Sequence, residues 1–246
     1  MSSNGRLTLF RGIAVPVEKA SHIKDHILRE GIRGDEGKQW RFELSDLRQS
    51  IDSLLQKPNL VPTDTGAEAG TSQFSVLCAC GDEVGASFYA TRHNARPNTR
   101  ETSYVIQFSA QSSGVYIDGR DFLYTCFQLW DQENKSSLEI QRRTLMKIYG
   151  SRIARYFDKA AASNDQQYRI AVCDLACQDA QIVESHVQNG ITVRGRHGVV
   201  FSSAFLVTAP VLPTEIIKVD EAIEMDFRPD LTLDDFLKGR INLNAQ

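Results

Sequence analysis

Hydrophobic and polar residues follow each other along the chain in patterns that predict both strands and helices. Period-two alternation and many β-branched residues predict strands, and the expected strands are 6–15, 74–79, 104–110, 115–124 and 168–176. The stretch SSAFLVTAPVLPTEIIKV at 202–219 predicts two more strands, joined by a short proline-containing loop, that close the sheet.

Apolar residues at helical spacing predict several helices, each with a recognisable end or interruption. A first helix stops at Gly31, Ser45 caps a second, and Gly85 interrupts a short third. Thr232 is the expected cap of a last small helix. The expected helices are 17–31, 45–55, 82–93, 136 to about 162, and 231–239.

These elements predict the domain organisation. Strands and helices do not alternate regularly, which is typical of an α+β fold and not of a parallel α/β sheet. We expect one domain spanning residues 1–246, with 57–73 as an exposed loop and 220–246 as a C-terminal extension that carries the last helix.

Composition narrows the class of protein. A net charge of −3 excludes a generally basic nucleic-acid binder but leaves local basic patches open. No apolar stretch approaches the roughly 20 residues of a membrane helix, and the start MSSNGR lacks the apolar region of a signal peptide. Five scattered cysteines suit a reducing compartment. We therefore predict a cytoplasmic protein without a membrane partner.

Potential metal ligands occur in two places, and neither predicts a metal site. Cys78 and Cys80 form a CxC whose side chains share one face of a strand, and no second ligand pair with suitable spacing follows. His22 and His26 share a helix face without a visible third ligand. We interpret the cysteines as core packing and the histidines as surface residues.

Three short motifs offer candidate chemistry, although each has a plainer interpretation. In LFRG, Arg11 could hold a phosphate through its planar fork and Gly12 would let a ligand approach the backbone; alone, the motif is more typical of a strand-end turn. ILREGI ends the first helix. GASFYA at 85–90 places small residues beside two aromatic rings able to stack on a ligand; alone, it is more often core.

The order of these motifs resembles the ADP-ribosyltransferase fold. A strand ending in RG, a helix ending in I-x-x-x-G-I, an A-x-x-Y-A helix and a VI-x-F strand follow each other over most of the chain. The resemblance implies a split β-sheet core with peripheral helices and NAD in a cleft between the two halves. It also implies cofactor-binding residues: Arg11, Gly12, Ile13, Ser87, Phe88 and Tyr89. Arg11 would contact the diphosphate and ribose, and Tyr89 or Phe88 would stack on nicotinamide.

The stretch SAFLV followed by VLPTEII is similar to the catalytic strand and next strand of the DarT toxins, which modify DNA. The resemblance puts Ala204 at the position of the catalytic glutamate. Two interpretations follow: a Glu→Ala form of an otherwise intact enzyme, which we favour because the neighbouring motifs are intact, or a non-catalytic member of the fold. A carboxylate there would stabilise the positive charge that develops on ribose, which a methyl group cannot do.

The segment before that strand, NGITVRGRHGVVFSS, is similar to the loop that reads the target in these enzymes. It implies a substrate contact by Arg194, Arg196 and His197, for which a solvated turn is the alternative. A second basic cluster follows GASFYA: Arg92, His93, Arg96 and Arg100. Such clusters suit phosphate contacts, although exposed arginines are common on proteins of every kind.

The resemblance therefore predicts an NAD-dependent ADP-ribosyltransferase, a toxin or defence effector. Nucleic acid (RNA or single-stranded DNA) is its first expected target and protein its second, and an antitoxin protein is a possible partner. Arg11 stands where many DNA-targeting relatives carry histidine, which weakens transfer of the target from that branch. The alternatives are a non-catalytic module that binds a nucleotide or a partner, and, ranked lower, RNA 2′-phosphotransfer.

Overall fold

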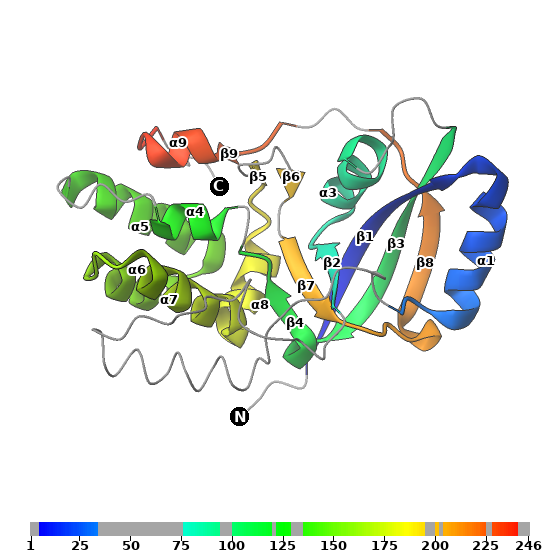
Figure 1. Ribbon diagram of the computed structural model, residues 1–246, viewed down its shortest axis with the longest axis horizontal. Coiled ribbons are helices and arrows are strands. Elements are labelled where there is room, and N and C mark those ends of the chain that lie inside the picture. Colours follow the sequence, from blue (N-terminus) through cyan, green and yellow to red (C-terminus); the bar gives the residue numbers. More distant parts are fainter. Residues whose placement is uncertain are drawn as a thin grey trace.

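The computed structural model describes residues 5–33, 76–93, 100–119, 122–128, 135–194, 200–201, 204–224 and 228–240. These residues form an α+β fold, as predicted, with a mainly antiparallel six-stranded sheet beside a group of helices (Figure 1). The expected helix at 45–55 and the expected loop at 57–73 lie outside the described residues.

The six-stranded sheet has the order β4-β7-β2-β1-β3-β8. A second sheet of three short strands has the order β6-β5-β9, with β5 and β9 parallel. The strands of the large sheet are β1 (Arg6–Pro16), β2 (Val76–Cys80), β3 (Glu101–Gln111), β4 (Val115–Ile117), β7 (Ala204–Thr208) and β8 (Ile216–Glu221). The small sheet contains β5 (Val193–Arg194), β6 (Val200–Phe201) and β9 (Leu231–Thr232).

Pairing within the large sheet is very uneven. All 11 residues of β1 pair with β3, and all five residues of β2 pair with β7. In contrast, β1 and β2 share a single residue pair, Phe10 with Cys80. The sheet therefore consists of two half-sheets, β1-β3-β8 and β2-β7-β4, that meet at one pair.

The helices divide into two groups around this sheet. Helix α1 (Ala20–Glu30) packs against β8 at one edge, and α3 (Glu83–Phe88) continues as a π-helical turn (Tyr89–His93) that packs on β1. The larger group lies beyond β4 and β7 (Figure 1). Its members are α4 (Leu123–Gln128), α5 (Lys135–Tyr149), α6 (Ile153–Ala161), α7 (Gln166–Gln178), α8 (Ala180–Asn189) and α9 (Leu233–Leu237).

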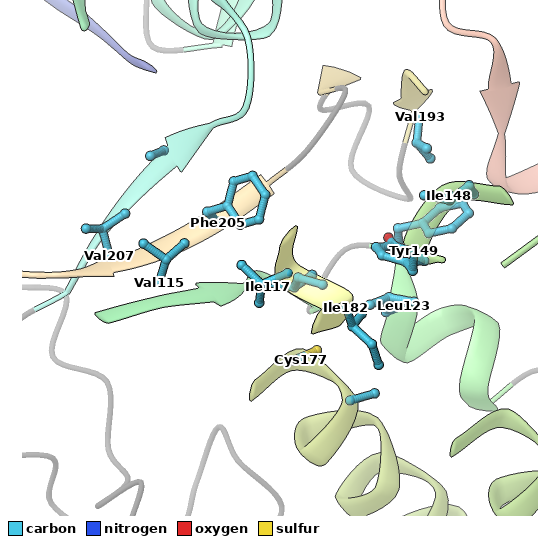
Figure 2. Close-up of a cluster of buried hydrophobic side chains, with 14 of the residues drawn as sticks. Val115, Ile117, Leu123, Ile148, Tyr149, Cys177, Ile182, Val193, Phe205 and Val207 are labelled. Carbon is cyan, nitrogen blue, oxygen red and sulfur yellow. The ribbon is translucent and has the colours of Figure 1, made fainter. Parts of the chain in front are cut away.

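The main core joins the second half-sheet to this larger group of helices. In β7, alternate residues Phe205 and Val207 are buried in it, as are Val115 and Ile117 of β4. Figure 2 shows these four side chains with residues of α4, α5, α7 and α8. The opposite face of the same strands carries a small separate cluster, Leu206 with Cys78 and Tyr116. Period-two alternation thus assigns each residue of β4 and β7 to one of two faces.

One predicted strand is wrong: residues 168–176 belong to helix α7. Every residue from Ala171 to Cys177 is buried, so the helix is surrounded by other elements on all sides. A continuous apolar run of this length is compatible with a buried strand or a buried helix, and periodicity cannot separate them. The contacts of α7 with α4, α6 and β4 decided the outcome.

Further differences concern where elements end. The long helix expected from 136 to about 162 is two helices, because Gly150 adopts a φ of +80° between α5 and α6. The expected strand 115–124 stops at Ile117 and α4 follows, while Gly85 lies inside α3 without interrupting it. The two strands predicted within 202–219 are present as β7 and β8, in different half-sheets: β7 pairs with β2 and β4, and β8 pairs with β3.

Candidate functional site at the junction of the half-sheets

Arg11 lies where the two half-sheets separate. It directly follows Phe10, which among the described residues is the one residue of β1 that pairs with β2. Its Nη1 donates a hydrogen bond of 2.6 Å to the backbone carbonyl of Cys78. The side chain therefore bridges from β1 to β2 just beyond their single pair. We call Arg11, Cys80, Tyr89 and Ala204 the junction residues.

Gly12 is buried under α3, which gives it a packing role. A Cβ built on Gly12 would lie 2.0 Å from the carbonyl oxygen of Ala86 and 2.8 Å from the amide nitrogen of Ala90. No side chain fits there without moving backbone. The predicted approach of a ligand to Gly12 stays a prediction; what the structure adds is that the glycine lets α3 contact β1.

Helix α3 is held over the junction by its own N-terminal cap. The Asp82 carboxylate accepts a hydrogen bond of 2.6 Å from the backbone N–H of Gly85. Burial raises the pKa of Asp82, although the hydrogen bonds from Gly85 and Val84 oppose the shift. Within the helix, Ala86 and Ser87 are buried. The cap and this packing fix the direction in which the following aromatic residues leave the helix.

The two candidate aromatic residues have different surroundings. Burial raises the pKa of Tyr89 to about 12, and the neighbouring Cys78 and Cys80 add to the shift while Arg11 opposes it. Its phenol therefore stays protonated at neutral pH, close to the junction. In contrast, the guanidinium carbon of Arg92 lies over the ring of Phe88, 5.8 Å from the ring centroid. Arg92 also forms an ion pair with Glu224 at 3.0 Å. Of the two rings, Tyr89 is the one at the junction.

Ala204 completes the junction from the second half-sheet. It is the first residue of β7, and it pairs with Cys80, the same residue that pairs with Phe10. Its methyl group is half-buried and packs on the small cluster that includes Cys80 and Ala86. The motifs that carry Arg11, Tyr89 and Ala204, far apart in sequence, thus meet at one place.

The other predicted residues have supporting or peripheral positions. Ile13 pairs with Tyr104 of β3 and packs half-buried on the main core. Ser87 is buried, and its carbonyl accepts a hydrogen bond of 2.9 Å from the Thr91 hydroxyl. Arg194 is exposed on β5, in the small sheet whose strand β6 contacts α3. Arg196, His197 and Arg96, and the side chain of His93, lie outside the described part of the chain.

The sequence interpretation missed one charged residue at this place, Asp118. Its backbone N–H donates a hydrogen bond of 2.8 Å to the carbonyl of Ala204. Its charge also contributes to the raised pKa of Tyr89. This carboxylate was expected inside a strand from 115 to 124, whereas the strand in the structure ends at Ile117, immediately before it. A strand that ends at an Asp-Gly pair is the signal that could have found it.

The cysteines and histidines offer no second candidate site in the part of the chain described. All five cysteines lie in the described residues and none forms a disulfide; Cys80 is buried, Cys78 is half-buried, and His22 and His26 are exposed. Among the described residues, no three His, Cys, Asp or Glu side chains are placed to hold a metal ion. Nor does any helix in these ranges have the length and apolar character to cross a membrane.

Comparison with known proteins assigns no family to the chain. No family model matches it, and no curated protein or solved structure is significantly similar to it.

Proposed function

We propose that the protein is an NAD-dependent ADP-ribosyltransferase whose site lies at the junction of the half-sheets. One observation carries this proposal: Arg11, Tyr89 and Ala204, each from a different motif of the resemblance, gather around the single pair that joins β1 to β2. Where the two half-sheets separate, an edge of β1 and an edge of β2 lie beside each other. NAD would bind there, between an anion-binding group and an aromatic ring.

The junction residues suit the two ends of NAD. A guanidinium presents five N–H donors in a planar fork that matches phosphate, and in Arg11 the Nη1 group is oriented by the Cys78 carbonyl. The ring of Tyr89 offers a flat, half-buried surface for nicotinamide, with its hydroxyl kept protonated. Arg11 would thus hold the diphosphate and Tyr89 would stack on nicotinamide.

The position of Ala204 is where the reaction would take place. Cleavage of the nicotinamide–ribose bond builds positive charge on the ribose, which a neighbouring carboxylate stabilises. A glutamate in place of Ala204 would extend from the end of β7 beside Cys80. The chain with alanine would then be an inactivated Glu→Ala form that keeps the shape of the site.

The target would be a macromolecule, with nucleic acid first and protein second. Exposed Arg194 pairs with Val200 of β6, the strand of the small sheet that contacts α3, the helix immediately before Tyr89. An arginine there suits contact with phosphate or stacking on a base. A toxin acting on RNA or single-stranded DNA in the cytoplasm, held in check by an antitoxin, is the role that follows.

The test is the Ala204→Glu variant, incubated with adenylate-labelled NAD and total cellular RNA, DNA and protein. We expect release of nicotinamide and label in one of the three pools, with RNA or single-stranded DNA the first expectation. Thr208→Glu is the matched control, since Thr208 lies on the same face of β7 at its other end. A folded Ala204→Glu protein that neither releases nicotinamide nor transfers label would refute the proposal.

The alternative is a non-catalytic module on the same fold, and the alanine at position 204 favours it. This protein would bind NAD or another nucleotide at the junction without consuming it. Calorimetric binding of NAD by both forms, with no turnover by either, is the result that would select this alternative.

A further inference from the structure

Asp118 lies beside position 204 because of the register of two strands. Tyr116 pairs with Leu206 and Ile117 with Phe205, so the next residues in register are Asp118 and Ala204. The hydrogen bond of 2.8 Å from the Asp118 N–H to the Ala204 carbonyl continues the ladder to this rung. Side chains directly opposite each other on antiparallel strands have Cβ atoms about 4.5–5.5 Å apart. A carboxylate therefore already stands next to the methyl group of Ala204.

The alternation of the strands also decides the face. Val115, Ile117, Phe205 and Val207 are buried in the main core (Figure 2). Tyr116 and Leu206 pack on the opposite face. Asp118 and Ala204 follow the even-numbered residues, so they share that opposite face with Cys80. Asp118, which directly follows β4, thus lies in one row with Ala204 of β7 and Cys80 of β2.

Two further observations place the Asp118 charge near the junction. It contributes to the raised pKa of Tyr89, whose other neighbours include Arg11 and Cys80. The residue after it, Gly119, is buried against α7 and α4: a Cβ built there would lie 2.8 Å from Cys177 Sγ and 3.3 Å from Tyr124. Because Gly119 is packed in this way, the backbone that carries Asp118 is fixed to the helical layer.

We propose that Asp118 is a second carboxylate of the site, acting beside position 204 on the ribose of NAD. This inference rests on the proposed function. In the chain with Ala204, Asp118 then stands beside the reaction, and it supports slow cleavage of NAD. With a glutamate at position 204, the two carboxylates work as a pair.

The slow reaction is hydrolysis of NAD to ADP-ribose and nicotinamide. The bond from ribose C1′ to the nicotinamide nitrogen breaks, and its electron pair stays with that nitrogen, which becomes neutral. Water forms the new C1′–O bond and loses a proton, which the Asp118 carboxylate accepts and passes to solvent. Asp118 also stabilises the positive charge on the ribose before water adds.

The first test measures nicotinamide release by the chain with Ala204, with protein in excess over NAD. The variants are Asp118→Asn, Asp118→Glu and, as a control, Asp220→Asn on the opposite half-sheet, where Asp220 pairs with Lys218. We expect Asp118→Asn to lose about 100-fold in rate, Asp118→Glu to retain most of it, and the control to equal its parent. Thermal unfolding confirms that each variant is folded. If Asp118→Asn does not fold, the rate of the Asp118→Glu variant still tests the inference.

The second test uses the Ala204→Glu background and a pH profile of the rate. Two carboxylates on directly opposite residues of paired strands disfavour each other's ionisation, so one of them titrates at raised pH. Asp118→Asn removes this repulsion. We therefore expect it to lower the apparent pKa of the acid limb by about one unit. A purely structural role for Asp118 would lower the rate without moving the profile.

The outcomes separate the inference from the proposed function. If Ala204→Glu cleaves NAD but Asp118→Asn changes neither rate nor profile in either background, the inference is wrong and the proposed function stands. Absence of nicotinamide release by the chain with Ala204 also counts against the inference. If Ala204→Glu neither binds nor cleaves NAD, the proposed function fails and the inference fails with it.

Discussion

Ala86 occupies the position that a side chain on Gly12 would need, since a Cβ built on Gly12 lies 2.0 Å from the Ala86 carbonyl oxygen. We expect Gly12→Ala to push α3 away from β1. The free energy of unfolding should decrease by about 1–3 kcal/mol, near the upper end of that range. Denaturant unfolding measures the change. Gly5→Ala is the control, because a Cβ there meets nothing within 4 Å. Equal stability for the two variants would contradict the close packing of α3.

The second prediction concerns the anion-binding role of Arg11. A charge-assisted hydrogen bond contributes about 1.5–3 kcal/mol, so Arg11→Ala should weaken NAD binding by about 10- to 100-fold. Arg6→Ala is a matched control on the same strand, since Arg6 instead contacts Ser109 and Glu215. Calorimetry on folded proteins measures both affinities. If Arg11→Ala binds NAD as its parent does, the diphosphate lies elsewhere.

The third prediction separates the two neighbouring rings. Stacking on an aromatic side chain is worth about 1–3 kcal/mol, so Tyr89→Ala should weaken NAD binding about tenfold, while Tyr89→Phe keeps the ring and the affinity. Phe88→Ala should leave the affinity unchanged, because Phe88 faces Arg92. A larger loss for Phe88→Ala than for Tyr89→Ala would reverse the assignment of the two rings.

The fourth prediction follows from a buried carboxyl in α7. Burial raises the pKa of Asp174 to about 7, although the hydrogen bond from the Tyr124 hydroxyl opposes the shift. The second carboxyl oxygen, Oδ2, is buried without a hydrogen-bond partner among the described residues. Among the described residues, only burial and the Tyr124 hydrogen bond shift this pKa, and no cation contributes to it.

The sign of the pH dependence follows from that raised pKa. The folded protein holds the Asp174 proton up to about pH 7, whereas the unfolded chain releases it near 3.8. Stability from this group is complete below the lower value and is lost as pH rises through about 7. At about 1.4 kcal/mol per pH unit, the loss from about pH 5 to 7 is on the order of 2–3 kcal/mol.

Asp174→Asn should remove this dependence and make the protein more stable than its parent at about pH 8. Chemical unfolding of both proteins across a pH series gives the difference. Burial lowers the pKa of His186 to about 3, so this group makes the folded protein less stable as pH falls. Because His186 is present in both proteins, its effect cancels in the difference between them. Exposed Asp25→Asn is the control. A constant difference between parent and Asp174→Asn over the series would contradict the prediction.

Local sequence signals determined several elements correctly. Alternation over 6–15 predicted β1, and Gly31, with a φ of +75°, ends α1 where expected. The Thr232 hydroxyl accepts a hydrogen bond from the Asp235 N–H, as predicted for a helix cap. Each of these features depends on residues within one turn or one strand, so the residues themselves contain the necessary information.

The candidate site shows where this information ends. The motifs that contain Arg11, Tyr89 and Ala204 were found in the sequence, but Asp118 was not, and Phe88 could not be separated from Tyr89. The register between β4 and β7 placed Asp118 beside Ala204. The packing of Arg92 on Phe88 left Tyr89 as the ring at the junction. Both outcomes depend on residues distant in sequence.

By itself the sequence determined the α+β class, the strands with clear alternation, and the segments that hold candidate chemistry. Only the tertiary structure decided that 168–176 is a helix, that β7 pairs with β2 and not with β8, and that β1 and β2 meet at one pair. The physical reason is that a buried apolar run is stabilised equally well by a helix or a strand until its neighbours are placed. In the same way, the order of strands in a sheet follows from contacts across the whole chain, which no local pattern contains.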